Sequence, residues 1–235
     1  MIKELSEMGT HHLDTNGENQ DALCHAQNQK LCVISLADGV STCKEAKSGA
    51  KIASRAITDL LFEKGENFLE FESEKVAEFA LSHILFELKQ RAKKDSKTVE
   101  EYSSTIASVL VDKKKKRMLC FNLGDSIIMA VSNGKCRVLV SPADSSSGCC
   151  VTTTKGAVTM ASVNMLDTAL VESVVICSDG AWRQMFDKNK LKSEVSYLLA
   201  NSEYDGVKDF LIGQNCFDDY SFISFDMRQK NWRKH

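Results

Sequence analysis

An apolar run that ends in an acidic residue and a glycine stands near the start of the chain: Leu31–Gly39 reads LCVISLADG. A short apolar run bounded by turn residues is typical of a buried β-strand, so this one would deliver the Asp38 carboxylate to a sheet edge. The arrangement returns in VESVVICSDG, whose last acidic residue is Asp179, and the pair Asp218-Asp219 directly precedes the final apolar run. Three strand ends that each carry Asp predict a shared site of oxygen ligands, which hard divalent cations prefer.

The composition is that of an ordinary folded protein. The 235 residues are 43% hydrophobic and 26% charged, and the net charge is −2. This length allows a full core, and without a linker or an internal repeat we expect one domain over residues 1–235, with its core at about 9–226. The charge gives no general attraction to nucleic acid, and the apolar runs are too short to span a bilayer, so neither nucleic acid nor membrane is an expected partner.

The cysteines are interpreted as inert thiols, although the adjacent Cys149 and Cys150 could also form a redox-active pair; no basic neighbour is evident to activate them. There are nine, scattered, and no pair has the C-x-x-C spacing of zinc ribbons or thioredoxin-like motifs. Several, such as Cys32 and Cys177, sit inside apolar strands, where a reduced thiol behaves as a small hydrophobe. The odd count and the lack of a signal-peptide pattern predict a protein of the reducing cytoplasm.

The pattern of elements predicts an α+β fold. A capping-box pattern at Thr42 and Glu45 predicts the start of a helix that closes near residues 64–66, and a second helix is expected over Ser73–Lys94. Short strands are expected at 22–24, 31–39, 104–111, 117–123, 127–131, 136–140, 171–177 and 220–225, and short helices at 191–199 and 206–212. Strands in blocks with helices grouped between them are typical of antiparallel sheets covered by helices on their outer faces.

Other segments are expected to be connections. Residues 1–20 are polar, 141–170 read as an irregular flap, and the tail from Met227 is expected to fray. Asn133-Gly134 is a hairpin signal. The lysine run after Asp112 is interpreted as a solvated hairpin tip and not as a nucleic-acid site, while His83 is interpreted as a histidine at a helix edge.

Six motifs stand in one order along the chain. They are NQDA (19–22), ADGVS (37–41), SSTIASVLV (103–111), NLGDS (122–126), CSDGA (177–181) and DDYSF (218–222). Together they resemble the type 2C metal-dependent Ser/Thr protein phosphatases, most closely the compact bacterial branch, where a Gly-x-x-His stretch precedes the first acidic motif, as Gly9 to His12 does here. The resemblance covers about residues 9–226.

The resemblance implies a fold, a metal site and an activity. The fold is a sandwich of two antiparallel β-sheets flanked by antiparallel helix pairs. Asp38 is expected to bridge two ions, Asp179 and Asp218 to complete the first, and the Gly39 carbonyl to reach the second. Two further positions complete the implied site: Asp21 would hold metal-bound water, and Asp125 is the candidate ligand of a third, weaker ion.

The implied chemistry is hydrolysis of phosphoserine and phosphothreonine in proteins. Carboxylates, a carbonyl and waters select Mn²⁺ or Mg²⁺, as two or possibly three ions. A water activated between two such ions would attack phosphorus directly, so no cysteine or aspartate nucleophile is needed. The implied partners are phosphorylated protein substrates in bacterial signalling, such as those of a Ser/Thr kinase.

The chain departs from the family pattern around the phosphate. Many members carry an arginine five residues before the position of Asp21, and this chain has Asn16 there. His12 is the nearest candidate to hold phosphate or to protonate the leaving group. Val40 replaces a proposed acid of eukaryotic members, and Ile127 replaces the usual arginine after the GDS motif, so the changes concern substrate grip more than metal binding.

Two other functions compete with this hypothesis. The departures also suit a catalytically impaired, phosphatase-like module that binds phosphopeptides or regulates a partner. A phosphatase of the haloacid-dehalogenase type, with an Asp nucleophile, also ends strands in Asp, but it requires D-x-D and this chain has Asp38-Gly39-Val40.

Overall fold

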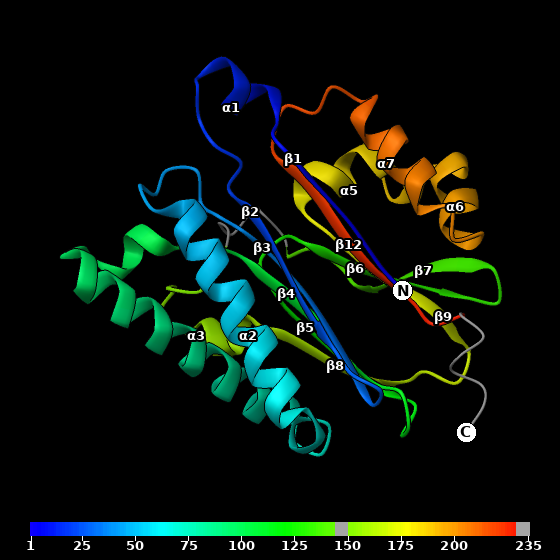
Figure 1. Ribbon diagram of the computed structural model, residues 1–235, viewed down its shortest axis with the longest axis horizontal. Coiled ribbons are helices and arrows are strands. Elements are labelled where there is room, and N and C mark those ends of the chain that lie inside the picture. The colour runs from blue at the N-terminus through cyan, green and yellow to red at the C-terminus, as the bar shows by residue number, and fades with distance from the viewer. Residues whose placement is uncertain (144–149, 229–235) are drawn as a thin grey trace.

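The computed structural model describes residues 1–143 and 150–228 (Figure 1). Its strands are β1 (Ile2–Glu7), β2 (Asp21–Gln27), β3 (Leu31–Asp38), β4 (Ile106–Asp112), β5 (Arg117–Leu123), β6 (Ile127–Ser132), β7 (Lys135–Val140), β8 (Ser162–Asp167), β9 (Val171–Cys177), β10 (Phe186–Asp187), β11 (Lys190–Leu191) and β12 (Tyr220–Asp226). Its α-helices are α1 (Thr10–Asp14), α2 (Ala46–Phe68), α3 (Ser73–Asp95), α4 (Ala157–Met160), α5 (Asp179–Met185), α6 (Ser193–Ala200) and α7 (Tyr204–Ile212). A 3₁₀ helix covers Val99–Tyr102.

Within the described residues, two five-stranded sheets form a sandwich. All strand pairs in them are antiparallel, and the orders are β1-β12-β9-β6-β7 and β2-β3-β4-β5-β8, with β10 and β11 as a separate ribbon. The core between the sheets takes apolar side chains from both, including Ile34 and Val109 from one and Ile176 and Phe225 from the other. The predicted α+β sandwich is therefore confirmed.

Strand β3 is apolar apart from the buried Ser35 and its last residue, Asp38, because both of its faces are covered. Cys32, Ile34 and Leu36 point into the core between the sheets, whereas Val33 and Ala37 point to the helical side. Alternate residues of a strand face opposite sides of the sheet, so a strand covered on both sides needs a continuous apolar run. Only the last residue, Asp38, is partly exposed, and it lies at the edge of the sheet.

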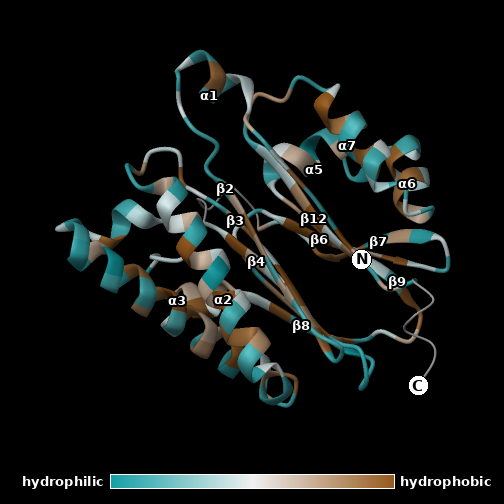
Figure 2. Ribbon diagram, in the orientation of Figure 1, coloured by the Kyte–Doolittle hydropathy of each residue, from teal (hydrophilic) through white to brown (hydrophobic). Residues whose placement is uncertain are grey.

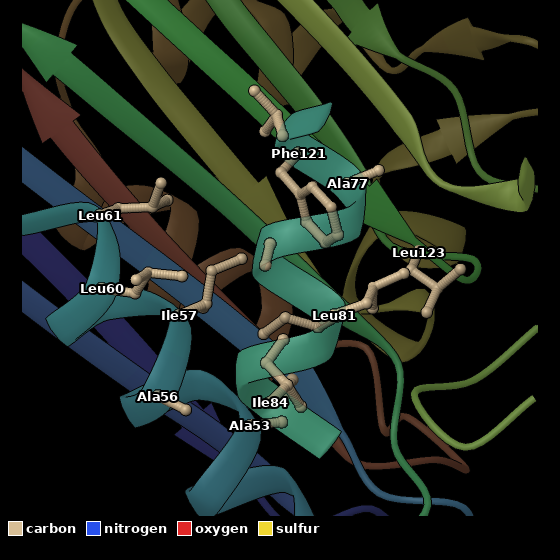
Figure 3. Packing of buried hydrophobic residues seen from close by; sticks show 14 of the residues in the cluster. Ala53, Ala56, Ile57, Leu60, Leu61, Ala77, Leu81, Ile84, Phe121 and Leu123 are labelled. Atoms are coloured by element: carbon tan, nitrogen blue, oxygen red, sulfur yellow. The ribbon is translucent and has the colours of Figure 1, made fainter. Parts of the chain in front are cut away.

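Helices α2 and α3 cover the outer face of the β2-β3-β4-β5-β8 sheet (Figure 1). Ile57 and Leu61 of α2 and Leu81 and Ile84 of α3 are fully buried there against β5 residues such as Phe121 (Figure 3). Full burial of side chains of this size stabilises the fold by roughly 1.5–3 kcal/mol each.

The opposite sheet is covered by α5, α6 and α7 (Figure 1). Val195 and Leu199 of α6 and Val207 and Leu211 of α7 pack with Phe222 of β12 in a second helix–sheet core. The hydropathy colouring shows apolar positions along the strands and on the sheet-facing sides of the helices (Figure 2). The helices on both sides hold the two sheets in one fixed stack, which is what positions the strand ends.

The polar N-terminal segment contains two elements that the sequence did not predict. Strand β1 pairs with β12, with Leu5 opposite Phe222 and Glu7 opposite Tyr220, and only Leu5 of the strand is buried. As an edge strand, β1 depends on backbone pairing more than on an apolar face. Its polar sequence therefore lacks the apolar pattern from which a strand is predicted. Helix α1 follows, and its single turn lies beside the segment before β12 (Figure 1).

Two predicted features of the first long helix were wrong. The helix begins at Ala46 after Glu45, with no side-chain cap, and not at a capping box on Thr42. It also continues past the expected stop to Phe68, with Gly65 inside it, where a Cβ would lie 2.8 Å from Leu110 Cδ2. The glycine is thus a contact with the sheet and not a helix end.

Most of the predicted turns are confirmed. Asn133 (φ 51°) and Gly134 (φ 66°) form the hairpin between β6 and β7, as the preferred turn with two positive φ values requires. The lysine run lies between β4 and β5, where Asp112 Oδ1 accepts the backbone N–H groups of Lys114 and Lys115 at 2.9 and 2.8 Å. Lys114, Lys115 and Lys116 are exposed, so the run is a solvated hairpin tip, as interpreted.

The flap from 141 to 170 is more regular than expected. It contains the short helix α4 and the strand β8, which pairs with β5 at the edge of its sheet. Residues 144–149 of the flap and 229–235 of the tail lie outside the described residues. No helix in the described part is long and apolar enough to cross a membrane.

Candidate active site

One sheet contributes two carboxylates that lie directly opposite each other. Strands β2 and β3 are antiparallel, and Asp21 at the start of β2 is the register partner of Asp38 at the end of β3. Residues paired in this way carry their side chains on the same face, with Cβ atoms about 4.5–5.5 Å apart. Asp38 is fixed by Thr105, the residue just before β4: its N–H donates to Thr105 Oγ1 (3.1 Å), and its carbonyl accepts the Thr105 N–H (2.8 Å).

The other sheet brings three more carboxylates to the same edge. Because β6, β9 and β12 are antiparallel neighbours, the starts of β6 and β12 meet the end of β9, and Cys177 is paired with both Ile127 and Phe222. Asp125 precedes β6, Asp179 follows β9, and Asp218 precedes β12. The sequence separation of these three residues therefore gives no measure of their distance in the fold.

Asp21 is the most deeply buried carboxylate of the set. It is 6% exposed, and neither Oδ1 nor Oδ2 has a hydrogen-bond partner among the described residues. The hydroxyls of Ser178 and Ser221 lie beside it and favour its charged form, but Ser178 Oγ donates to the Ser221 carbonyl and Ser221 Oγ to Ser6. Burial therefore dominates and raises the pKa of Asp21 to about 7, with added repulsion from neighbouring carboxylates.

Asp38 is the electrostatic centre of the site. Its pKa is raised well above the ordinary value, first by burial and then by the negative charges of Asp21, Asp179, Asp218 and Asp125. Because the energy between two charges falls as their separation grows, this coupling places the five carboxylates, which come from both sheets, in one region. The structure thus brings together all five predicted aspartates, and Gly39 follows Asp38 in the chain.

Asp179 shows the balance of charges at the site. Burial and the charge of Asp125 raise its pKa to about 6, whereas Arg183 acts in the opposite direction. Arg183 Nη1 lies 2.8 Å from Asp179 Oδ2, while Asp179 Oδ1 is buried and has no partner in the described part. A buried carboxylate oxygen without a donor costs free energy unless a proton or a cation reaches it.

The donor set fits hard divalent cations. It consists of carboxylate oxygens, it lacks thiol and imidazole ligands, and Asp21 and Asp179 present buried oxygens without donors. Among the described residues, no three or more His, Cys, Asp or Glu side chains are already closed into a metal-binding group. Carboxylates that repel one another are expected to stay apart until cations offset their charge.

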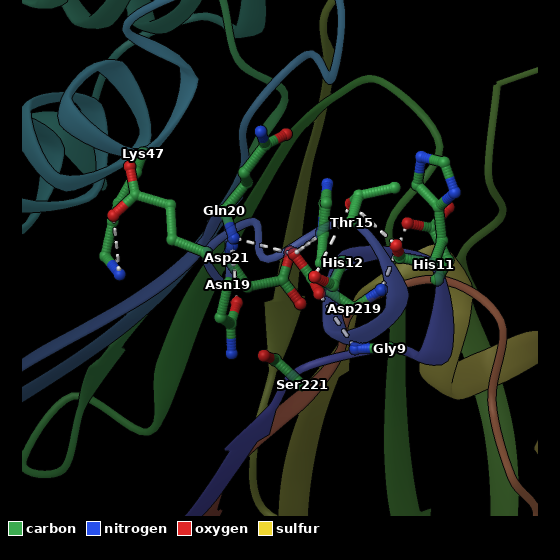
Figure 4. Close-up of polar contacts among 12 residues, drawn as sticks. Gly9, His11, His12, Thr15, Asn19, Gln20, Asp21, Lys47, Asp219 and Ser221 are labelled. Carbon is green, nitrogen blue, oxygen red and sulfur yellow. Dashed lines mark hydrogen bonds and ion pairs between the residues drawn. The ribbon is translucent and has the colours of Figure 1, made fainter.

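Asp219, the second residue of the acidic pair, is the main site residue that the sequence did not reveal. Unlike the exposed Asp218, it is 3% exposed and accepts three hydrogen bonds: from Gly9 N–H (2.9 Å), Gln20 N–H (2.7 Å) and His12 Nδ1 (2.9 Å) (Figure 4). It therefore ties helix α1 and the start of β2 to the start of β12. His12, itself buried, reaches the site through this contact.

Close backbone contacts fix the segment that carries Asp218. A Cβ at Gly9 would lie 2.2 Å from the Asp218 carbonyl carbon, and a Cβ at Gly180 would lie 2.1 Å from the Asp219 carbonyl oxygen. Only glycine allows backbones to approach this closely. The glycine of the Asp179-Gly180 pair is therefore required for packing against the segment before β12.

Arg183 was also missed, although a signal for it was present. It lies four residues after Asp179 on α5, and acidic and basic residues at this spacing face each other on a helix. No comparable signal identified Asp219, because the sequence does not indicate which of the two adjacent aspartates is buried.

Comparisons with known proteins agree with this fold. No protein with a curated description matches the sequence. Solved structures that it resembles include a bacterial serine phosphatase (16% identity, 97% of this chain and 98% of that chain, TM-score 0.71). The serine/threonine phosphatase Stp1 from Staphylococcus aureus is similar at 17% identity over 97% of this chain and 95% of that one, with a TM-score of 0.69.

A third similar structure, RsbX in complex with magnesium, is 13% identical over 95% of this chain and 92% of that one, with a TM-score of 0.59. At these identities the structures show a shared fold. The family is shown by sequence, because the model of the family described as protein phosphatase 2C matches residues 8–213. The chain therefore belongs to the protein phosphatase 2C family.

Proposed function

We propose that this protein removes phosphate from phosphoserine and phosphothreonine in phosphorylated proteins, with two Mn²⁺ or Mg²⁺ ions at the edge of the sandwich. The observation that carries the proposal is the convergence of carboxylates from both sheets: Asp21 lies opposite Asp38 across β2 and β3, and the ends of β6, β9 and β12 that carry the other three meet at the same edge. Membership of the phosphatase family and the magnesium complex of a similar structure support it.

The carboxylates have different places in the proposed site. Asp38 would bridge the two ions, Asp179 and Asp218 would complete the first, and the Gly39 carbonyl would reach the second. Asp21 lies opposite Asp38 in the ladder between β2 and β3. Its carboxylate oxygens, which have no partner among the described residues, would accept a hydrogen bond from an ordered water. The bound ions would activate a water for attack on phosphorus and offset charge on the phosphoryl oxygens.

His12 has a narrower proposed role. Its Nδ1 faces Asp219, so only Nε2 remains to hold a phosphate oxygen or to protonate the leaving alkoxide. The Asp219 carboxylate fixes the ring in this orientation and favours a proton on Nδ1. We further propose cytoplasmic substrates of a Ser/Thr kinase, in line with the cysteine pattern and the activity.

Hydrolysis of a phosphothreonine peptide by the purified protein, with and without Mn²⁺, tests the function. Phosphate release should depend on the metal and fall by at least ~100-fold in Asp38→Asn and Asp179→Asn, since loss of metal ligands removes most of the activation. Asp187→Asn, an exposed aspartate of β10, is the matched control and should keep full activity.

Absence of metal-dependent turnover above background would refute the enzyme hypothesis. Calorimetry with the same peptide then separates the alternative: tight binding without product release would identify a phosphopeptide-binding module. Equal activity in Asp38→Asn and the parent protein would show that chemistry occurs elsewhere.

A further inference from the structure

Arg183 bridges two carboxylates that belong to different strand ends. Its Nη1 lies 2.8 Å from Asp179 Oδ2, and its Nη2 lies 4.0 Å from Asp125 Oδ2. Asp179 stands after β9 and Asp125 before β6, so α5 places one guanidinium across the junction of two neighbouring strands. The planar guanidinium offers donors in several directions, which suits such a bridge.

The two oxygens of Asp179 are divided between two environments. Oδ2 faces Arg183, whereas Oδ1 is buried and has no partner among the described residues. The guanidinium therefore holds the carboxylate in one orientation and leaves its other oxygen for a cation on the inner side. Arg183 is 50% exposed, so it approaches the site from the solvent side.

Neighbouring contacts hold this bridge in place. Trp182 Nε1 donates to the Asp125 carbonyl at 2.8 Å, which fixes the loop before β6 onto α5. The Arg183 guanidinium carbon lies 5.8 Å from the centre of the Trp182 ring. Two adjacent residues of α5 thus contact Asp125, one through its backbone and one through its side-chain charge.

We propose that the Arg183 guanidinium is a built-in cation that takes the place of a third divalent ion between Asp179 and Asp125, so that the protein binds two ions and not three. The reason is charge: a divalent ion between these carboxylates would lie within a few ångströms of a permanent positive charge. The inference rests on the proposed two-metal function.

Counting bound ions tests this proposal. Mn²⁺ is added to the metal-free protein up to millimolar concentration, and the free ion is measured by its electron paramagnetic resonance signal. The parent protein should bind two ions per chain, Arg183→Lys should also bind two, and Arg183→Asp should gain a third, weaker ion. Adding Asp125→Asn to Arg183→Asp should remove that third ion again.

Arg137→Asp is the matched control, because Arg137 is an exposed arginine on β7 and the charge change is the same. It should bind two ions. Three ions in the parent protein, or no gain in Arg183→Asp that circular dichroism shows to be folded, would overturn the proposal while leaving two-metal catalysis intact. No bound ion in the parent protein would overturn the proposed function itself.

Discussion

Replacing Asp21 with asparagine is expected to stabilise the metal-free protein above about pH 7 and to weaken its response to metal. Asp21 is buried, its oxygens have no partner in the described part, and its pKa is raised to about 7. The Ser178 and Ser221 hydroxyls beside it can accept the N–H groups of an asparagine amide. Asparagine therefore removes the charge and keeps the shape.

The size of the effect follows from linkage. A rise of the pKa from 3.8 to about 7 is a shift of about three units, and each unit corresponds to ~1.4 kcal/mol. Because the folded-state pKa of this acid is raised, its stabilising contribution is full below pH 3.8 and is lost as the pH rises to about 7. Neighbouring carboxylates share the repulsion, so we expect a gain of about 2–4 kcal/mol for Asp21→Asn at about pH 8 and about 1 kcal/mol at about pH 4.5.

Urea unfolding in the presence of a chelator, at both pH values, measures this difference. Asp187→Asn, the exposed control, should change the free energy of unfolding by less than ~0.5 kcal/mol at either pH. With Mn²⁺ at ~100 times its dissociation constant, the parent protein should gain ~2.7 kcal/mol, and Asp21→Asn should gain less. If Asp21→Asn destabilises the metal-free protein at the higher pH, the assignment of a buried, repelled carboxylate is wrong.

Three further substitutions test the backbone and the hydrogen bonds around the site. Gly180→Ala should lower Mn²⁺ affinity by at least ~10-fold in calorimetry, because the new Cβ would lie 2.1 Å from the Asp219 carbonyl oxygen and must displace the segment of Asp218; unchanged affinity would contradict the close packing. Asp219→Ala leaves the buried donors of Gly9 and His12 and the partly buried donor of Gln20 without an acceptor and should cost about 3–5 kcal/mol in urea unfolding. Asp219→Asn keeps one acceptor oxygen and should lose roughly half of that; equal losses in the two variants would argue against the hydrogen bonds as the cause.

The sequence predicted those parts of the fold in which burial determines which positions are apolar. Strand β3 is covered on both faces and reads as one apolar run, and the apolar stripes of α2 and α3 face one sheet. Strand β1 stabilises the fold mainly by pairing its backbone with β12, so its polar side chains carried no signal. The strand β8 in the flap was missed for the same reason: it is an edge strand, and none of its residues is fully buried.

The carboxylates could be predicted because each is attached to a strand end with a recognisable pattern. A shared site was inferred from three strand ends that each carry Asp, but the order of strands that brings them together is known only from the structure. The register of β2 and β3 places Asp21 opposite Asp38, and this pairing depends on a turn at Asn28 whose side chain accepts the N–H groups of Lys30 and Leu31 at 2.8 Å each. A slip of one residue would turn Asp21 to the other face.

Asp219 and Arg183 show what lies beyond such patterns. Their placement depends on which neighbours approach from elsewhere in the chain: the glycine contact at Gly9 brings α1 to Asp219, and the end of β9 brings α5 to Asp125. Asp219, the neighbour of Asp218, holds α1 and the segment before β2 in place. Arg183 contacts Asp179 and Asp125 of the proposed metal site. The orientation of His12 should therefore depend on Asp219, and the number of bound ions on Arg183, in addition to the carboxylates of the site.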